Sequence, residues 1–278
     1  MSEKRIFKMI KLGIKQIRQP YYQGVAAQLA FYFMLSIVPI LIVFSQLLGF
    51  FSISLEVLSD IINEYFDSEI AYILQRFITY SPTGTMNVFF TIIALWSASK
   101  VQFSMIRIAN YTITEGKSTG EGYIRNRLKA MKTMLIALFS VTFALVILVY
   151  GEPLLRLVLS VVNRNLNIVY EVDSLLLFIR WPAALALYFL MVSYSYYALP
   201  YGKVEYRKIL PGSIFAAISM LLVTYLYSIY IGYIANFDII YGSLATFVAL
   251  MFWFFFLSWA LVLGVVFNKV YYDTKPQK

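Results

Sequence analysis

Few polar side chains in this sequence could do chemistry, and most of them lie inside long apolar runs. Arg180 is the only charged residue within any of these runs, and Trp181 and Pro182 follow it directly. A guanidinium held among apolar residues can bind a phosphate or a carboxylate through paired hydrogen bonds. It can also extend toward the outer lipid headgroups, with Trp181 anchoring the helix at the interface. Both interpretations stay open at this stage.

Weaker polar groups in the other apolar runs form a second set of candidates. Each offers a hydrogen-bonding side chain or, in one case, a proline ring that frees a backbone carbonyl at membrane depth. They are Gln28, Ser36, Pro39, Ser97, Ser99, Tyr188 and Tyr225. Buried hydroxyl and amide groups need partners, so these residues either join helices or contact a ligand. With Arg180 they are the predicted ligand-binding residues, and an anionic amphiphile is the ligand class that fits them.

The absence of two residue types narrows the chemistry. The chain contains no histidine and no cysteine, which removes imidazole bases, thiol nucleophiles, disulfides and almost every zinc or haem site. Most acidic residues outside the basic segments fall between Glu56 and Glu69. Apolar residues at helical spacing place those carboxylates on the polar face of an amphipathic helix. The sequence therefore predicts no catalytic residues, no metal, no cofactor and a protein that is not an enzyme.

Six apolar runs must position these side chains. A run of about 18 apolar residues crosses a hydrocarbon core of about 30 Å as a helix, and without water such segments have to be helical. The predicted spans are about 25–51, 82–99, 133–151, 174–200, 212–235 and 243–268. The fold class is therefore all-α, a polytopic membrane protein with amphipathic interfacial helices. The expected parts are an interfacial helix in 1–24, a membrane domain over 25–268 with external amphipathic segments 52–84 and 152–173, and a tail over 269–278.

The basic residues set the expected orientation. Of the 23 Lys and Arg residues, 19 fall in the N-terminal tail, in the connections after the second and fourth spans, or in the C-terminal tail. The positive-inside rule then places both termini in the cytoplasm. The net charge of +9 is explained by this topology and by attraction to anionic lipid. Because the basic residues are spread over four segments, nucleic acid is not expected as a partner, whereas membrane lipids are.

Local patterns predict further details. Residues 4–18 form an amphipathic helix that ends before Pro20. The second span continues as a helix through Ile113, and Thr114–Gly122 is a loop, while 236–242 is a tight turn. Small residues at four-residue spacing, such as Gly212 with Ala216 and Ala260 with Gly264, indicate that helices approach closely.

Several sequence pieces together resemble the YihY/BrkB family of bacterial inner-membrane proteins. The matching pieces, in order, are 26–32 (AAQLAFY) with Ser36 and Pro39, 95–99 (LWSAS), Arg180-Trp181, Pro211-Gly212, 241–244 (YGSL), Trp253, Gly264 and Asn268. The resemblance runs from about residue 5 to 270. The chain departs from the family's Gly-Ala-Glu-x-Asn ending, because Val266 stands where the family tends to carry glutamate. The resemblance implies a multi-pass protein of the bacterial plasma membrane.

Three functions are weighed. The preferred expectation is binding or transport of an anionic lipid or lipid-linked intermediate, which Arg180 and the polar faces of the first two spans favour. The alternative is a scaffold in the cell envelope that transports nothing. The resemblance also brings a ribonuclease label, but phosphodiester cleavage requires clustered carboxylates with a metal, or a histidine pair. The acidic residues on the expected cytoplasmic side are widely dispersed. The oligomeric state is not predicted.

Overall fold

The computed structural model describes the backbone of residues 3–50, 59, 62–63, 68–79, 85–140, 172–202, 204–234 and 243–275. Within these ranges the chain forms helices and no strands, which confirms the all-α expectation. The helices are α1 (Glu3–Ile17), η1 (Pro20–Tyr22), α2 (Val25–Phe50), α4 (Ser68–Thr79), α5 (Thr85–Ala98), α6 (Lys100–Ile113), an unlabelled helix over 123–140, α8 (Val172–Ala198), α9 (Tyr206–Ile234) and α11 (Ser243–Asp273). The expected turn at 236–242 and nearly all of the external segment 152–173 lie outside the described residues, as does most of 52–84.

Three stretches of the described chain are long and apolar enough to cross a membrane. They are Pro20–Val43, Tyr206–Tyr230 and Phe247–Asp273, and Ala184–Ala198 is a shorter apolar helix. The last two helices exceed their expected spans, because α9 begins at Tyr206 and α11 continues to Asp273. Residues 269–273, expected in the tail, are therefore helical.

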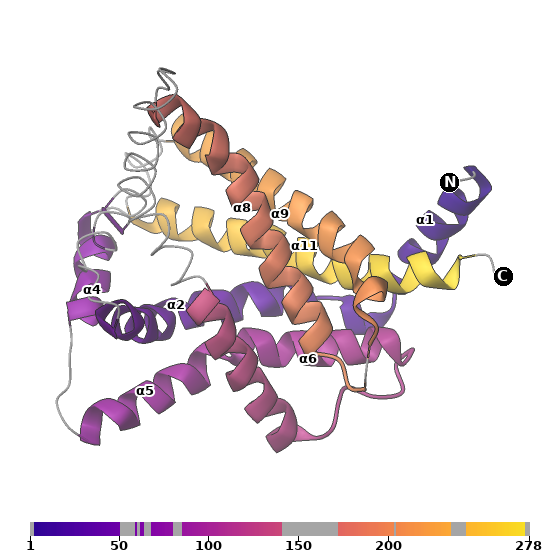
Figure 1. Ribbon diagram of the computed structural model, residues 1–278, viewed down its shortest axis with the longest axis horizontal. Coiled ribbons are helices and arrows are strands. Elements are labelled where there is room, and N and C mark those ends of the chain that lie inside the picture. Colours follow the sequence, from indigo (N-terminus) through magenta and orange to yellow (C-terminus); the bar gives the residue numbers. More distant parts are fainter. Residues whose placement is uncertain are drawn as a thin grey trace, which may run out of the picture.

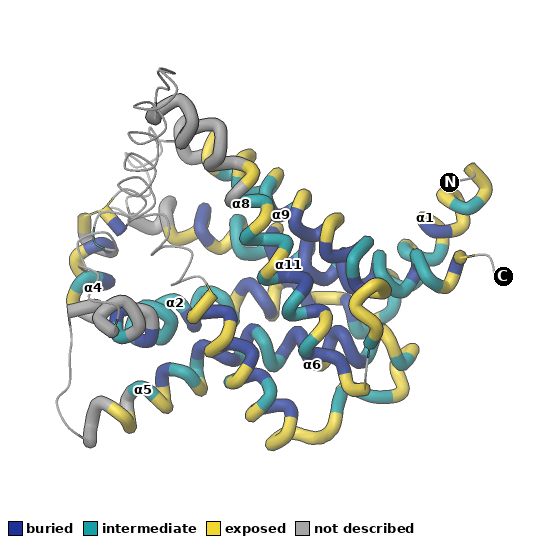
Figure 2. The backbone as a smooth tube through the Cα atoms, viewed as in Figure 1, coloured by how far each residue is buried: buried dark blue, intermediate teal, exposed yellow. Residues whose placement is uncertain are grey.

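Helix α11 is the centre of the packing (Figure 1). It packs against α9, α2, α1 and α6, while α8 packs on α9 and α5 packs on α2. Buried residues gather where α6, α9 and α11 meet (Figure 2). The N-terminal helix α1 lies beside the last turns of α11, so both chain ends occupy the same end of the molecule. This end contains α1, the 114–122 loop and the C-terminal turns of α11. We call it the basic end, because of the many lysine and arginine residues of α1.

Glycines allow α9 and α11 to cross closely at the basic end. A methyl group added at Gly212 would collide with the carbonyl oxygen of Gly264 and would lie 2.5 Å from the Cγ of Asn268. The backbones can approach only because neither glycine carries a side chain, as in other membrane helix pairs. The expected close approach at Gly212 and Gly264 is confirmed.

A proline in α9 supplies one of the bonds between these helices. Pro211 has no N–H, so the carbonyl of Arg207, four residues earlier, lacks its usual helical partner. The hydroxyl of Tyr272 in α11 donates to this carbonyl at 2.5 Å. The amide of Gly212 donates to the Oδ1 of Asn268, also in α11, at 2.6 Å. The turn of α9 around the proline is thus bonded to a second helix.

The second predicted span is divided at Ser99 into two helices. There α5 ends at Ala98 while α6 begins at Lys100. The Ser99 hydroxyl donates back to the Trp96 carbonyl at 2.8 Å, a contact that commonly bends helices. Helical bonds still run through this residue, because the Ser99 amide donates to the Leu95 carbonyl and the Ser99 carbonyl accepts from the Phe103 amide. The predicted continuation as a helix through Ile113 and the following loop are confirmed, with a turn at Ser99 itself.

Candidate functional site

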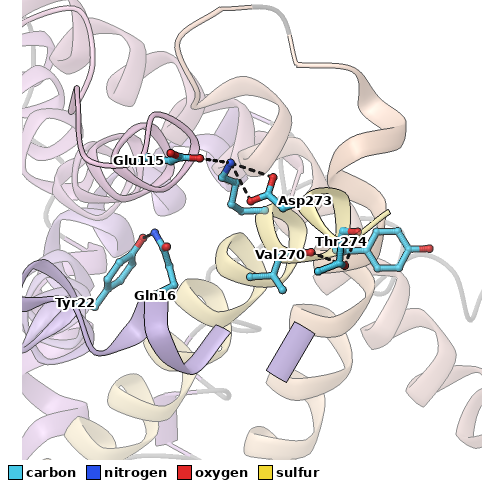
Figure 3. Close-up of polar contacts among 8 residues, drawn as sticks. Gln16, Tyr22, Glu115, Val270, Asp273 and Thr274 are labelled. Carbon is cyan, nitrogen blue, oxygen red and sulfur yellow. Dashed lines mark hydrogen bonds and ion pairs between the residues drawn. The ribbon is translucent and has the colours of Figure 1, made fainter. Parts of the chain in front are cut away.

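Helix α6 forms the interior of the basic end. Eight of its residues are buried, including Asn110 and Thr112. The hydroxyl groups of Thr112 and Tyr22 are 2.6 Å apart, and Gln16 of α1 donates to the Tyr22 hydroxyl at 3.2 Å (Figure 3). Asn110 accepts a hydrogen bond from the amide of Tyr201 at 2.5 Å. These bonds fix η1, α6 and the connection between α8 and α9 relative to one another.

A polar pocket opens beside α6 where η1 leads into α2. Its volume is about 380 Å³, and its walls are formed by Tyr21, Gln23, Gly24, Val25, Gln28, Ser104 and Arg107. Gly24 has φ of +77°, a left-handed conformation that glycine adopts without strain, and α2 begins at the next residue. Tyr21 is held by its ring, which stacks on Tyr111 at a centroid distance of 3.7 Å. The pocket is therefore built on ordered backbone.

The charge of the polar pocket comes from Arg107. No acidic residue that the structure describes lines the pocket. Arg107 is exposed and forms no ion pair with any residue that the structure describes. A guanidinium offers paired donors that match a phosphate or a carboxylate. The first-turn amides of α2 add partial positive charge in the same region. The arrangement suits an anion.

A second pocket at the basic end has a different electrostatic character. It measures about 260 Å³, lies between α6, α9 and α11, and contains Glu205, Lys208, Lys269 and Asp273 among mainly apolar residues. Lys208 pairs with Glu205 at 3.4 Å. The amine of Lys269 contacts Asp273 at 3.0 Å and Glu115 at 2.9 Å (Figure 3). Hydrogen bonding to Lys269 lowers the pKa of the Glu115 carboxyl. Because its lysines are already neutralised, this pocket is a poorer anion site than the polar pocket.

The predicted ligand-binding residues do not form one site in the part of the chain that the structure describes. Gln28 lines the polar pocket and donates to the Tyr32 hydroxyl at 3.2 Å. Ser36 is fully buried, and its hydroxyl donates to the Ala98 carbonyl at 3.4 Å. Ser99 is also fully buried and bonds within its own turn, beside the partly buried Ser97. Of these serines, Ser36 joins α2 to the end of α5.

The remaining predicted residues are distributed over three helices. Pro39 lies inside α2. The Tyr188 hydroxyl is 3.1 Å from that of Thr224, which joins α8 to α9, and Tyr225 is 48% exposed on α9. Arg180 lies within α8, but its side chain is outside the described residues. Its orientation toward the bundle or the headgroups therefore remains a prediction.

Arg127 is a buried cation that the sequence analysis did not single out. It is 3% exposed, its guanidinium donates to the Trp96 carbonyl, and it lies 4.4 Å from the centre of the Trp96 ring. Its charge is thus placed at the C-terminal, partly negative end of α5. In the sequence, Arg127 is one of the many basic residues that set the expected orientation. An apolar stripe at helical spacing could have shown that this face is buried, namely Ala130, Met134, Ala137 and Leu138.

Apolar helices of spanning length and a helical bundle with exposed apolar side chains define the class, an integral membrane protein. Residues 14–278 match the family described as Virulence factor BrkB. The chain therefore belongs to the virulence factor BrkB family. It is similar to the putative ribonuclease-like protein YfkH of Bacillus subtilis (strain 168), with 29% identity over 259 residues that cover 91% of each chain. No solved structure matches it.

Proposed function

We propose that this protein binds an anionic amphiphile, a lipid or a lipid-linked intermediate, with the headgroup in the polar pocket beside Arg107. The observation that carries the proposal is a cation in a pocket that is lined, among the described residues, by no acidic side chain and that offers this cation no carboxylate partner. The headgroup would contact Arg107 and the side chains of Gln28 and Ser104. The apolar tail would extend along α2, where Phe31 and Leu35 are exposed.

The membrane arrangement that we propose has six spans with both termini in the cytoplasm of a bacterial plasma membrane. Arg5 supports it, because its guanidinium donates to the Tyr271 carbonyl at 3.1 Å and so holds the first helix against the last. Termini at one end of a bundle are what an even number of crossings produces. With this orientation the polar pocket faces the cytoplasmic leaflet, which is rich in anionic lipid.

The name of the relative suggests a second function, ribonuclease activity. Two observations favour binding over cleavage. Within the described residues no group of three or more acidic side chains could hold a metal ion, and the sequence has no histidine. The nuclease would be supported instead if purified protein cleaved RNA in the presence of a metal ion and a substitution in this protein abolished the cleavage.

Binding can be tested with phosphatidylglycerol and a polyprenyl phosphate, each measured against phosphatidylcholine by native mass spectrometry of the full-length protein. Arg107→Gln should weaken binding of both anionic lipids by about tenfold or more, because charged hydrogen bonds are lost. Arg107→Lys should retain part of it, since lysine keeps the charge but not the paired donors. Arg125→Gln is the matched control, because Arg125 is also exposed but lies outside the pocket.

Equal loss in the Arg107→Gln and Arg125→Gln variants would mean that general charge, rather than the pocket, attracts the lipid. Unchanged binding in the Arg107→Gln variant would contradict the proposal. Transport and scaffolding are then separated by reconstitution. Movement of a labelled anionic lipid between leaflets that depends on Arg107 supports transport, whereas binding without movement supports the scaffold.

A further inference from the structure

Helix α1 presents three different faces. One face packs on α11 and buries Met9. A second carries Lys4, Lys8, Lys11 and Lys15, whose spacing of four, three and four residues places them in one exposed stripe, the lysine stripe. Between these two lies an exposed apolar stripe of Ile6, Phe7, Ile10 and Ile14. Packing within the protein explains only the first face.

An apolar groove of about 430 Å³ runs between α1 and the pair α9 and α11. Gly13 and Ile14 line it on the α1 side, and Phe215, Val266 and Phe267 line it on the other. The rings of Phe215 and Phe267 stack with their centroids 5.0 Å apart, which gives the groove an ordered aromatic wall. A side-chain carbon added at Gly13 would find no atom within 4 Å. The glycine thus leaves space over the groove that the chain does not fill.

The surroundings of the groove identify the chemistry of its occupant. Phe215 and Phe267 belong to helical stretches that are apolar enough to cross a membrane, so the groove lies where acyl chains are present. None of the four lysines of the stripe forms an ion pair with a residue that the structure describes. Unpaired lysines beside an apolar surface attract anionic headgroups.

We propose that the groove holds one acyl chain of an anionic phospholipid whose phosphate is bound by the lysine stripe. This lipid fills the space that Gly13 leaves and attaches α1 to α9 and α11. The site is distinct from the polar pocket, because the groove and the pocket share no residue. This lipid site can therefore be tested independently of the proposed function.

Photo-crosslinking tests the acyl-chain part of the site. Full-length protein in phosphatidylcholine nanodiscs receives a small amount of phosphatidylglycerol with a diazirine on one acyl chain. After irradiation, the label should be found by mass spectrometry in peptides covering Glu3–Ile17 and Leu263–Val270. Gly13→Phe should remove most of this label by filling the groove, while the matched variant Gly13→Ala should keep it. Wild-type labelling in the Gly13→Phe variant, or equal loss in both variants, overturns the proposal.

The lysine stripe is tested by charge removal. Replacing Lys4, Lys8, Lys11 and Lys15 with glutamine should abolish the preference for phosphatidylglycerol over a phosphatidylcholine probe, while acyl-chain labelling in the groove persists. The control replaces four exposed basic residues elsewhere with glutamine, namely Lys117, Arg125, Lys132 and Arg207, and should keep the preference. A preference that survives loss of the stripe, or falls equally in the control, overturns the assignment of the headgroup.

Discussion

Helices α9 and α11 form the most extensive helix–helix contact of the described chain, and two regions of it differ. At the basic end, glycines bring the backbones together, and Asn268 and Tyr272 bond across the interface. Farther along, an open apolar groove of about 510 Å³ lies between the same helices, lined by Tyr227, Trp253 and other, mostly large side chains. One helix pair is thus closed at one end and open at the other. The helices touch at both ends, since Tyr227 stacks on Trp253 at the open end. The size of the residues between the helices determines how closely their backbones approach.

The largest expected effect on the unfolding free energy comes from adding a single methyl group at the closed end. Gly264→Ala would bring its Cβ against the Tyr196 hydroxyl and within 2.8 Å of the Ala216 Cβ. Because neighbouring backbone leaves no room to relax, we expect a loss of about 3 kcal/mol or more in unfolding free energy. Unfolding in mixed detergent micelles measures it. Leu226→Phe at the open end adds more volume and should change stability by under about 0.5 kcal/mol. Similar losses in both variants would remove the contrast.

Loss of a hydrogen bond across the crossing should be the next largest effect. Asn268→Leu leaves the Gly212 amide without its side-chain acceptor, at an expected cost of about 1–3 kcal/mol. Tyr272→Phe removes a more exposed bond, to the Arg207 carbonyl, which water can replace, so the cost should be about 1 kcal/mol or less. The same unfolding experiment ranks the two variants, and the reverse order would show that the proline-freed carbonyl is the more important link.

At the open end a shared hydroxyl should contribute less. Thr224 lies 3.1 Å from the Tyr188 hydroxyl and accepts a longer bond, 3.4 Å, from the Trp253 indole. Thr224→Val keeps the shape and removes both bonds. Hydrogen bonds between membrane helices contribute about 0.6 kcal/mol on average, so we expect a loss of about 1 kcal/mol. A double-mutant cycle with Tyr188→Phe should show positive coupling, and purely additive losses would mean that the two hydroxyls do not interact.

The smallest expected effect is a pH dependence of the unfolding free energy that comes from Glu115 at the closed end. Lys269 lowers the pKa of Glu115, so the folded protein binds this proton less readily than the unfolded chain. The stabilisation is present above the ordinary pKa of glutamate, about 4.3, and is lost as the pH falls through the lowered value. Glu115 is exposed, so the effect should be small and should weaken further in salt. The pH dependence of unfolding, compared with that of Glu115→Gln, measures it, and identical curves would contradict it.

The sequence predicted the elements better than the site. The long apolar runs predicted α2, α9 and α11, and the small residues at Gly212 and Gly264 predicted where two of them touch. The burial of helix α6 was harder to predict, because its apolar residues alternate with Gln102, Arg107 and Asn110. Such a pattern is typical of an exposed helix. Only the packing of α6 beneath η1 and α11 shows that its polar groups bond inside the bundle.

The site itself depends on contacts that no local pattern contains. Gln28 was predicted from its depth in an apolar run, but Arg107 comes from a helix about eighty residues later in the chain. Their presence in one pocket depends on the turns at Gly24 and Ser99. Ser36 and Ser99 are buried, and their hydroxyls donate to carbonyls of this protein. Their role in ligand binding stays a prediction.

The position of Arg127 bears on how the protein is assembled during translation. Trp96 and Phe103 leave the ribosome before Arg127, so the carbonyl and the aromatic rings that receive the guanidinium are made first. Both partners of the guanidinium are therefore synthesised before the cation that binds them. The helix that begins at Tyr123 can thus pack against Trp96 before the third apolar run is complete.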